Sequence, residues 1–326
     1  MGAFYSHLVF RPPVPPSYTQ EDFPITWIET KQNTVFPCTF IEESNAYFTL
    51  LFSHGNGEDL GNAVGYLRQL CRVLNVNALA YDYTGYGLAT GKPSEEGCYA
   101  NVEAAYLHLI NERNIPPERI IVFGRSLGSA PSIHIACLKP VRGLILVSPL
   151  SSCIRVVRPK LHVTLPFDMF VNIHKISLVR CPVLIVHGCR DQVVPFSHGL
   201  DLYKRCRVAV DPLWIADGGH NNLELYHREE MVERYKQFLD YIIKCPFGGA
   251  QVEQGASPWK RLWRKEKEKQ TKKQHEEGSA ILNSSVEGGV SERRKMGRVE
   301  RVAVDQSLQR NSKRYFHFRR KNSRTI

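Results

Sequence analysis

A five-residue pattern, Gly124-Arg-Ser-Leu-Gly128, constrains the fold of this chain more than any other feature. The apolar residues 120–123 come directly before it, and a run of small residues typical of a helix follows it. This order predicts a strand, a tight turn and a helix, with the hydroxyl of Ser126 accessible at the turn as a candidate nucleophile. The pattern is short enough to occur by chance in a glycine-bounded loop, so its interpretation depends on partner residues elsewhere.

Partner residues for Ser126 follow later in the chain. A serine hydroxyl is a weak nucleophile at neutral pH and needs a histidine base that a carboxylate orients. Asp191 lies in a polar turn after the mostly apolar residues 181–188, and His220 lies in a loop after the apolar residues 212–216. The order Ser, Asp, His, each just past a predicted strand, is that of an α/β-hydrolase fold and predicts a catalytic triad of these three residues.

Each partner also has a simpler interpretation, because a turn aspartate is often solvated and a histidine at a helix start often only caps the helix. Three other residues fit the same roles less well. His187 lies within a strand end, Asp217 lies beside the candidate base rather than on its own strand, and Asp168 falls in a region predicted to be a cap.

An apolar run that ends in a glycine-rich turn, residues 50–57, resembles an oxyanion loop. Acyl transfer passes through a tetrahedral oxyanion that preorganised backbone N–H groups stabilise. We expect one donor to be the N–H of Leu127 and the second to be the N–H of Asn56, with that of Gly57 as the alternative. His54 is expected to shape the turn rather than to take part in the chemistry.

Short apolar runs alternate with longer amphipathic ones from about residue 34 to residue 244. The chain has 326 residues, 43% of them hydrophobic, which is enough for one large core. Strands are predicted at residues 35–41, 48–52, 78–83, 120–123, 144–147, 183–186 and 213–216, and helices at 60–74, 95–111, 126–137, 197–205 and 223–243. The alternation predicts a mostly parallel twisted sheet with helices on both faces, and residues 35–41 pairing at its edge.

Three parts are expected along the chain. Residues 1–33 form an N-terminal extension with a candidate lipid anchor, residues 34–245 form the α/β-hydrolase catalytic domain, and residues 246–326 form a basic, largely disordered tail. The interval after the sixth core strand, about residues 149–180, is longer than a plain connection. It predicts a small cap that covers Ser126 and lines an acyl pocket, with an irregular surface helix as the alternative.

Several longer strings resemble one family. They are Phe52-Ser-His-Gly-Asn56, Tyr81-Asp-Tyr-Thr-Gly-Tyr-Gly87, Gly91-Lys-Pro-Ser94, Ser148-Pro-Leu150, Phe196-Ser-His-Gly-Leu200 and Gly219-His-Asn221, together with the pattern around Ser126. Across residues 8–244 the chain is similar to the α/β-hydrolase-domain-containing protein 17 group, which are membrane-associated protein depalmitoylases. The resemblance implies hydrolysis of the thioester between a fatty acyl chain and a protein cysteine.

No metal or organic cofactor is expected, because the triad chemistry needs none and no Cys-x-x-Cys ligand spacing occurs. The nine cysteines are scattered and no apolar signal segment opens the sequence. These features predict reduced thiols and a cytoplasmic enzyme. The protein is expected to be a monomer.

The N-terminal sequence departs from the family pattern. Members of the group carry a palmitoylated cysteine cluster near the N-terminus, whereas the first cysteine here is Cys38. Met1-Gly-Ala-Phe-Tyr-Ser6 instead fits the N-myristoylation pattern, so Gly2 is a candidate lipidation site. A chance match to this permissive motif is the alternative.

All of the net charge lies in the C-terminal tail. Residues 1–244 have 23 basic and 23 acidic side chains, whereas residues 245–326 have 20 and 9. Trp259, Leu262 and Trp263 share one helical face among basic residues, which predicts contact with a membrane surface of anionic lipid. Disorder fits the tail's composition, and nucleic-acid binding through its basic and aromatic residues is an unfavoured alternative. No apolar run is long enough for a transmembrane helix.

The sequence therefore predicts a peripheral enzyme at the cytosolic face of a membrane, acting on S-acylated proteins. A carboxylesterase or lysophospholipase that cleaves oxygen esters of lipids would use the same triad. An inactive hydrolase fold that serves as a membrane adaptor is the alternative from another class, and the intact triad disfavours it.

Overall fold

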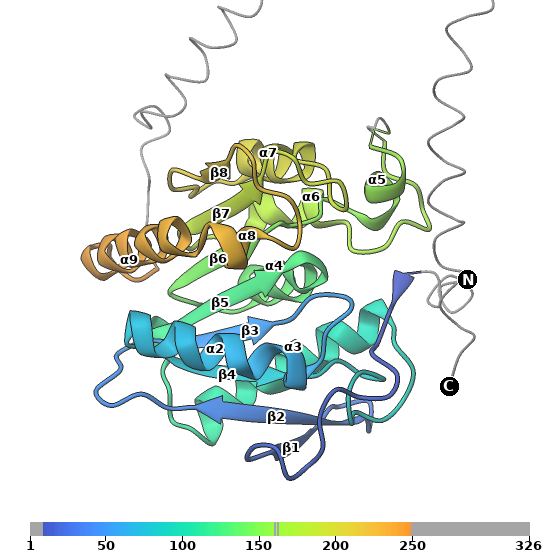
Figure 1. The fold of residues 1–326 in the computed structure, drawn as a ribbon, viewed down its shortest axis with the longest axis vertical. Coiled ribbons are helices and arrows are strands. Elements are labelled where there is room, and N and C mark those ends of the chain that lie inside the picture. The colour runs from blue at the N-terminus through green and yellow to red at the C-terminus, as the bar shows by residue number, and fades with distance from the viewer. Residues whose placement is uncertain (1–8, 160, 162, 249–326) are drawn as a thin grey trace, which may run out of the picture. The chain divides into compact units, whose positions relative to one another are not determined.

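The computed structural model describes residues 9–159, 161 and 163–248, all of which belong to the first of two units into which the chain divides, residues 1–263 and 264–326. Within the described residues, eight strands form one sheet in the order β1-β2-β4-β3-β5-β6-β7-β8 (Figure 1). The strands are β1 (Thr26–Glu29), β2 (Val35–Ile41), β3 (Thr49–Ser53), β4 (Asn77–Tyr81), β5 (Ile120–Arg125), β6 (Gly143–Val147), β7 (Val183–Gly188) and β8 (Leu213–Ile215). The pairs β1–β2 and β2–β4 are antiparallel, and all the others are parallel. This arrangement confirms the predicted α/β-hydrolase architecture.

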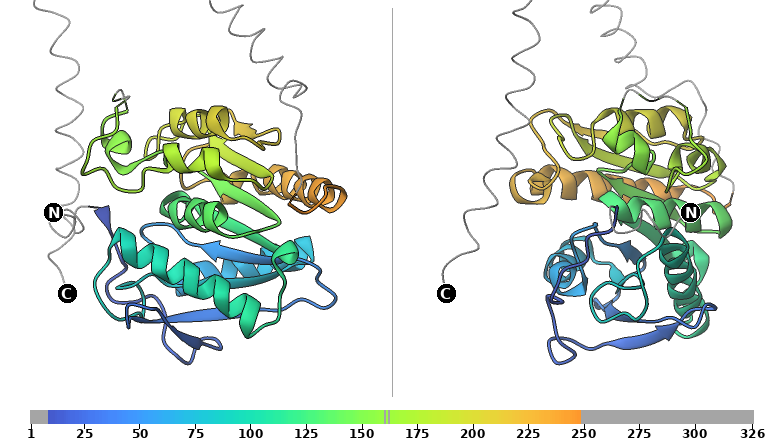
Figure 2. Two further views of the ribbon diagram at one scale, coloured as in Figure 1. Left: turned by 180° about the vertical axis from the view of Figure 1, so that it is seen from behind. Right: turned by 90° about the vertical axis from the view of Figure 1, so that its right-hand side faces the viewer.

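Helices cover both faces of the sheet, which explains why its central strands are apolar on both sides (Figures 1 and 2). The longer helices are α2 (Leu60–Leu74), α3 (Glu95–Asn111), α4 (Ser129–Leu138), α7 (Ser197–Arg205) and α9 (Arg228–Lys244). The apolar side chains of α2 and α9 pack on one face, and those of α3, α4 and α7 pack on the other. The sheet therefore lies in the middle of a three-layer core.

The predicted bounds of α2, α3 and α7 are confirmed, and local signals set two of the starts. Asp59 accepts a hydrogen bond from the N–H of Asn62 in a capping box that opens α2. Ser94 accepts one from the N–H of Gly97 at 2.9 Å and opens α3. The helix expected from residue 126 instead starts at Ser129, because a 3₁₀ turn occupies Ser126–Gly128.

Two expectations about the ends of the fold are wrong. Residues 35–41 do not form the sheet edge, because β1 pairs outside β2. The fold thus begins before residue 34, and the side chains of Phe10, Tyr18 and Phe23 are buried in it. The single helix expected at residues 223–243 is divided into α8 (Leu223–Tyr226) and α9, because the backbone leaves the helical conformation at His227.

The segment between β6 and β7 contains the short helices α5 (Cys153–Val157) and α6 (Asn172–Lys175). Two hydrogen bonds connect the start of this segment to its later part. The N–H of Cys153 donates to the carbonyl of Met169 at 2.9 Å, and the N–H of Ile154 donates to the carboxylate of Asp168 at 2.9 Å. Figure 1 shows this segment at the same end of the sheet as the start of α4. It has the position expected of a small cap.

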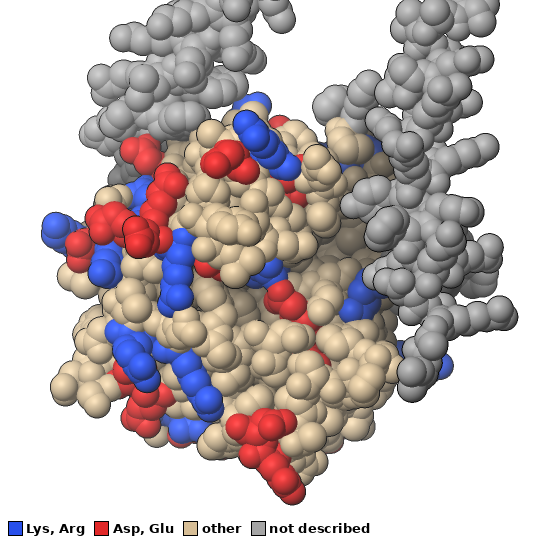
Figure 3. All heavy atoms as spheres, viewed as in Figure 1, with Lys and Arg blue, Asp and Glu red and all other residues tan. Residues whose placement is uncertain are grey.

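Charged side chains of both signs are interspersed on the face seen in Figure 3, among broad uncharged areas. This distribution agrees with the balance of charges in residues 1–244. No helix among the described residues has the length and apolarity needed to cross a membrane.

Candidate active site

Ser126 lies at the turn between β5 and α4 in a strained backbone conformation, with φ of 51°. The flanking glycines are required by close packing. A Cβ atom on Gly124 would come within 2.5 Å of the carbonyl oxygen of Gly128, and one on Gly128 would come within 2.0 Å of that of Ser53. The pattern thus forms the predicted nucleophile elbow, in which a sharp turn presents the serine hydroxyl.

The structure brings the three predicted triad residues together, although they lie far apart in the sequence. Nε2 of His220 is 2.9 Å from Oγ of Ser126, and Nδ1 of His220 is 2.7 Å from Oδ2 of Asp191. Because a carboxylate only accepts hydrogen bonds, Nδ1 holds the proton and Nε2 is free to accept the serine proton. The imidazole is therefore oriented as a general base for Ser126.

Asp191 is held as a buried carboxylate. Burial raises its pKa, but hydrogen bonds from His187 and His220, the charge of His220 and the N–H of Val194 together lower the pKa well below its usual range. Its Oδ1 accepts from the N–H groups of Val193 and Val194 at 2.9 and 2.8 Å. The ionised carboxylate favours the tautomer of His220 that is protonated at Nδ1.

His187, a weaker candidate for the base, is fully buried behind Asp191 rather than near Ser126. Its Nε2 donates to the carbonyl of Val194 at 2.9 Å and lies 3.4 Å from the Asp191 carboxylate. Through this contact His187 holds the loop that contains Asp191. Only its location within the end of a buried strand could have indicated this role from the sequence.

The other competing residues lie outside the triad. Asp168 accepts the N–H of Ile154 within the cap, and Asp217 is an exposed residue 3.6 Å from His227. His54 is buried beneath the loop after β3, with Nδ1 2.8 Å from the carbonyl oxygen of Gly55.

Residues of the loop after β3 line the same pocket as Ser126 and Leu127. The N–H of Gly55 donates to the carboxylate of Glu58 at 2.8 Å, so it is not free for an oxyanion. Asn56 and Gly57 both line the pocket, as expected for the second donor. The assignment of the oxyanion donors to Leu127 and Asn56, with Gly57 as the alternative, stays a prediction.

The pocket beside Ser126 has a volume of about 480 Å³ and a largely apolar wall. The cap supplies part of this wall through Leu150, Cys153, Val156 and Val157. Val9 and the pair Val193–Val194 add further apolar surface, so the site suits an aliphatic group next to the nucleophile.

Arg125, which precedes the nucleophile, was not identified from the sequence. It forms ion pairs with Glu58, on the loop after β3, and with Glu224, on α8, at 2.9 Å in the second pair. The three side chains are partly buried. Arg125, the last residue of β5, thus joins the loop after β3 and the short helix α8 to the strand that precedes Ser126.

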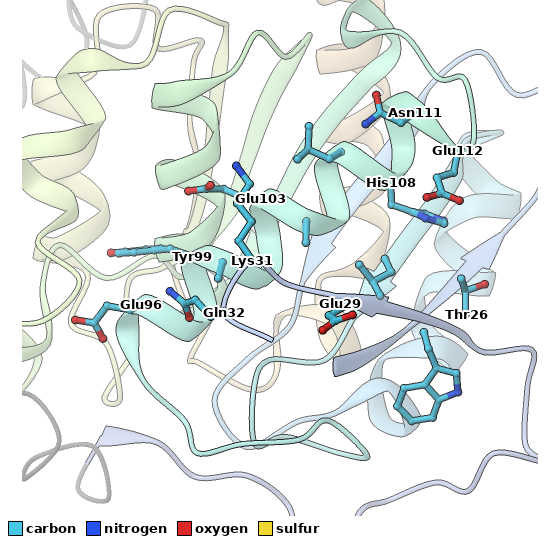
Figure 4. A pocket seen from close by; sticks show the side chains of 15 residues that line it. Thr26, Glu29, Lys31, Gln32, Glu96, Tyr99, Glu103, His108, Asn111 and Glu112 are labelled. Atoms are coloured by element: carbon cyan, nitrogen blue, oxygen red, sulfur yellow. The ribbon is translucent and has the colours of Figure 1, made fainter. Parts of the chain in front are cut away.

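A second groove, of about 570 Å³, lies between β1 and α3 (Figure 4). Its wall includes Glu29, Glu96, Glu103 and Glu112 but no serine or cysteine. A hydrolase of this class needs a nucleophile paired with a base, so the smaller pocket at Ser126 is the candidate active site.

Among the described residues there is no cluster of His, Cys, Asp and Glu that could hold a metal ion. All nine cysteines lie in this part of the chain and none forms a disulfide. The expected membrane contacts, Gly2, Trp259, Leu262 and Trp263, lie outside the described residues.

The sequence was compared with known proteins. Over 211 residues the chain is 46% identical to human alpha/beta hydrolase domain-containing protein 17B, covering 64% of this chain and 73% of that protein. This chain belongs to the same family. The chain is also 44% identical to alpha/beta hydrolase domain-containing protein 17C of Xenopus laevis, covering 66% of this chain and 68% of that protein. It is 40% identical to aho-3 of Caenorhabditis elegans, covering 73% of this chain and 78% of that protein. No protein-family model matches the chain.

Solved structures agree with the fold of this chain. The Pyrococcus furiosus esterase Pf2001 superposes with a TM-score of 0.60 at 20% identity, covering 72% of this chain and 97% of the esterase. Mouse alpha/beta hydrolase domain-containing protein 10 superposes with a TM-score of 0.53 at 19% identity, covering 67% of this chain and 99% of the mouse protein. At such low identity these similarities establish the α/β-hydrolase fold, and the relatives establish the family.

Proposed function

We propose that this protein is a serine hydrolase that removes fatty acyl groups from S-palmitoylated proteins. The observation that supports hydrolysis most directly is the continuous hydrogen-bonded series from Asp191 through His220 to Ser126, at 2.7 and 2.9 Å. The apolar wall of the adjoining pocket suits a fatty chain, and the family resemblance favours a thioester over an oxygen ester.

In the proposed reaction, Oγ of Ser126 attacks the thioester carbonyl carbon while Nε2 of His220 takes its proton. The oxyanion that forms accepts hydrogen bonds from the N–H groups of Leu127 and Asn56. The C–S bond then breaks, and the departing sulfur takes the proton from His220. Water attacks the acyl-serine with the same base, releasing the fatty acid and restoring Ser126.

We further propose that the enzyme acts at the cytosolic face of a membrane. A myristoyl group on Gly2 would bind the membrane only weakly, and the basic tail with Trp259, Leu262 and Trp263 would add attraction to anionic lipid. Mass spectrometry of the intact N-terminus tests the lipid, and sedimentation with phosphatidylserine vesicles tests the tail. An unmodified Gly2 in cells, or equal sedimentation after removal of residues 249–326, would contradict the respective part.

The serine mechanism is tested with a fluorophosphonate probe. The wild type should be labelled, Ser126→Ala should not, and Ser177→Ala, a serine in the cap region away from the pocket, should be labelled normally. Absence of labelling in all three proteins would instead favour an inactive adaptor.

The substrate class is tested by comparing release of palmitate from a palmitoylated cysteine peptide and from a lysophospholipid. We expect a higher kcat/KM for the thioester in the wild type and no release by Ser126→Ala. Faster cleavage of the lipid oxygen ester would contradict the thioesterase assignment and identify a lysophospholipase.

A further inference from the structure

The N-terminal segment of residues 9–18, called here the N-terminal strap, contacts the loop of residues 54–59, called here the oxyanion loop. We propose that the strap is a positioning element of the active site: it holds Asn56 so that the oxyanion loop keeps its catalytic conformation. This inference rests on the proposed function, because it assigns the role through the reaction at Ser126.

Three hydrogen bonds fix the side chain of Asn56. Its Nδ2 donates to the carbonyl of Val9 at 2.6 Å, and its Oδ1 accepts from the N–H of Arg11 at 3.0 Å and from the hydroxyl of Tyr86 at 2.6 Å. The same hydroxyl accepts from the N–H of Arg11 at 3.1 Å. The side-chain amide of Asn56 thus bonds to the strap backbone through both its nitrogen and its oxygen.

The strap also contacts the other end of the oxyanion loop. The N–H of Ser17 donates to the carboxylate of Asp59 at 2.7 Å, and its hydroxyl donates to the same group. Tyr18 donates to Asp82, whose second oxygen accepts the N–H of Leu60 at 2.9 Å. The loop is therefore held by the strap on both sides of the glycine at position 57.

Phe10 anchors the strap in the core. Its side chain is 3% exposed and packs edge-on against Tyr86 at 6.4 Å and against Phe170 of the cap at 5.9 Å between ring centroids. Val9 lines the pocket beside Ser126. One short stretch of chain thus contacts the oxyanion loop, the cap and the substrate pocket.

The oxyanion loop needs such an anchor because Gly55 and Gly57 flank Asn56. Glycine leaves the backbone free to adopt many conformations, and rotation of one peptide plane would turn the Asn56 N–H away from the oxyanion. Hydrogen bonds to the Asn56 side chain oppose this rotation. Preorganised donors stabilise a transition state only when their direction is set in advance.

The strap directly follows residues 1–8, which lie outside the described part of the chain. Val9 is seven positions after Gly2, and seven residues of extended chain span at most about 25 Å. A lipid on Gly2 would therefore tether Val9 within about that distance of the membrane surface.

The test uses a soluble short-chain p-nitrophenyl ester, so that membrane binding does not affect the rate. Asn56→Ala keeps the backbone N–H but loses all three side-chain bonds, and we expect kcat to fall about 10- to 100-fold with KM within threefold. Tyr86→Phe loses one of the three bonds and should show a smaller fall. The pH profile should be unchanged in both, because the His220–Asp191 pair is untouched.

Two controls separate positioning from loss of stability. Val102→Ala creates a cavity in α3 away from the site and should lower Tm without changing kcat. Deletion of residues 1–8 should keep full activity on the soluble ester, whereas deletion of residues 1–11 should reduce kcat as Asn56→Ala does.

A normal kcat in Asn56→Ala would overturn the positioning role. So would a Val102→Ala variant that has the same Tm as Asn56→Ala and loses as much kcat. Activity of Ser126→Ala on the same ester would instead overturn the serine mechanism itself. The two failures are therefore distinguished by separate variants.

Discussion

Arg125 and Glu224 connect the segments that contain Ser126 and His220 through their side chains. Nε of Arg125 is 2.9 Å from Oε1 of Glu224, although the residues are 99 positions apart in the sequence. Arg125 directly precedes Ser126, and Glu224 lies four residues after His220. A second ion pair, with Glu58, extends this connection to the oxyanion loop.

We expect Arg125→Met to lower both stability and activity. The loss of a partly buried cation leaves two carboxylates unpaired, so the free energy of unfolding should fall by about 1–3 kcal/mol. The rate should fall as the loops at Ser126 lose their common contact, and urea denaturation with steady-state kinetics would measure both. Asp201→Asn, which removes the charge from an exposed pair at 3.9 Å, serves as the control and should change stability by less than about 0.5 kcal/mol. Equal effects of the two substitutions would contradict the role of Arg125.

The positive φ of Ser126 predicts that glycine is the more stable of two inactive substitutions at this position. Glycine adopts a positive φ without steric cost, so Ser126→Gly should be more stable than Ser126→Ala by up to about 1 kcal/mol. Both variants lack the hydroxyl and should be inactive. Thermal unfolding of the two proteins side by side tests this, and a less stable glycine variant would show that the turn is not strained.

Protonation of His198 is expected to destabilise the folded protein in mild acid. Burial, the largest effect, lowers the pKa of His198 to about 4, and its Nδ1 accepts the N–H of Ser151 at 3.0 Å. Because the unfolded chain binds this proton near pH 6.5 and the folded chain does not until about pH 4, stability is lost as the pH falls between these values. The contribution is at most about 3 kcal/mol.

The His198 prediction is checked by urea denaturation of the wild type and of His198→Gln at pH 7, 6, 5 and 4.5. The glutamine variant should lose less stability across this range, since its side chain accepts a hydrogen bond without titrating. Parallel curves for the two proteins would show that another group is responsible.

The position of Val157 in the pocket wall predicts that the acyl chain lies against it. This residue of α5 lines the pocket beside Ser126, yet it is 76% exposed. Val157→Asp should raise KM for a palmitoyl thioester about tenfold or more, because a charge then faces the alkyl chain, while an acetyl thioester should be cleaved as before. Val163→Asp, an exposed cap residue outside the pocket lining, is the matched control. Unchanged selectivity in Val157→Asp would place the chain elsewhere.

Local sequence patterns determined the framework of this protein. The apolar runs at β5 and β7 mark buried strands because both faces of a central parallel strand contact helices. The glycines around Ser126 and the capping residues Asp59 and Ser94 act through atoms a few residues away, so the elbow and the starts of α2 and α3 could be predicted. The order of Ser126, Asp191 and His220 along the chain then predicted a triad, and the structure places these three side chains within hydrogen-bonding distance.

Only the tertiary structure decided how these parts are held. The pairing of β1 with β2, the contact of the strap with Asn56 and the link from Arg125 to Glu224 join segments that the sequence separates. No local pattern in the sequence identifies these contacts. The residues around a short strand, an asparagine or an arginine look the same whether its partner is solvent or a distant segment. Packing of the helices on the sheet determines which of these groups meet, and with them the geometry around Ser126.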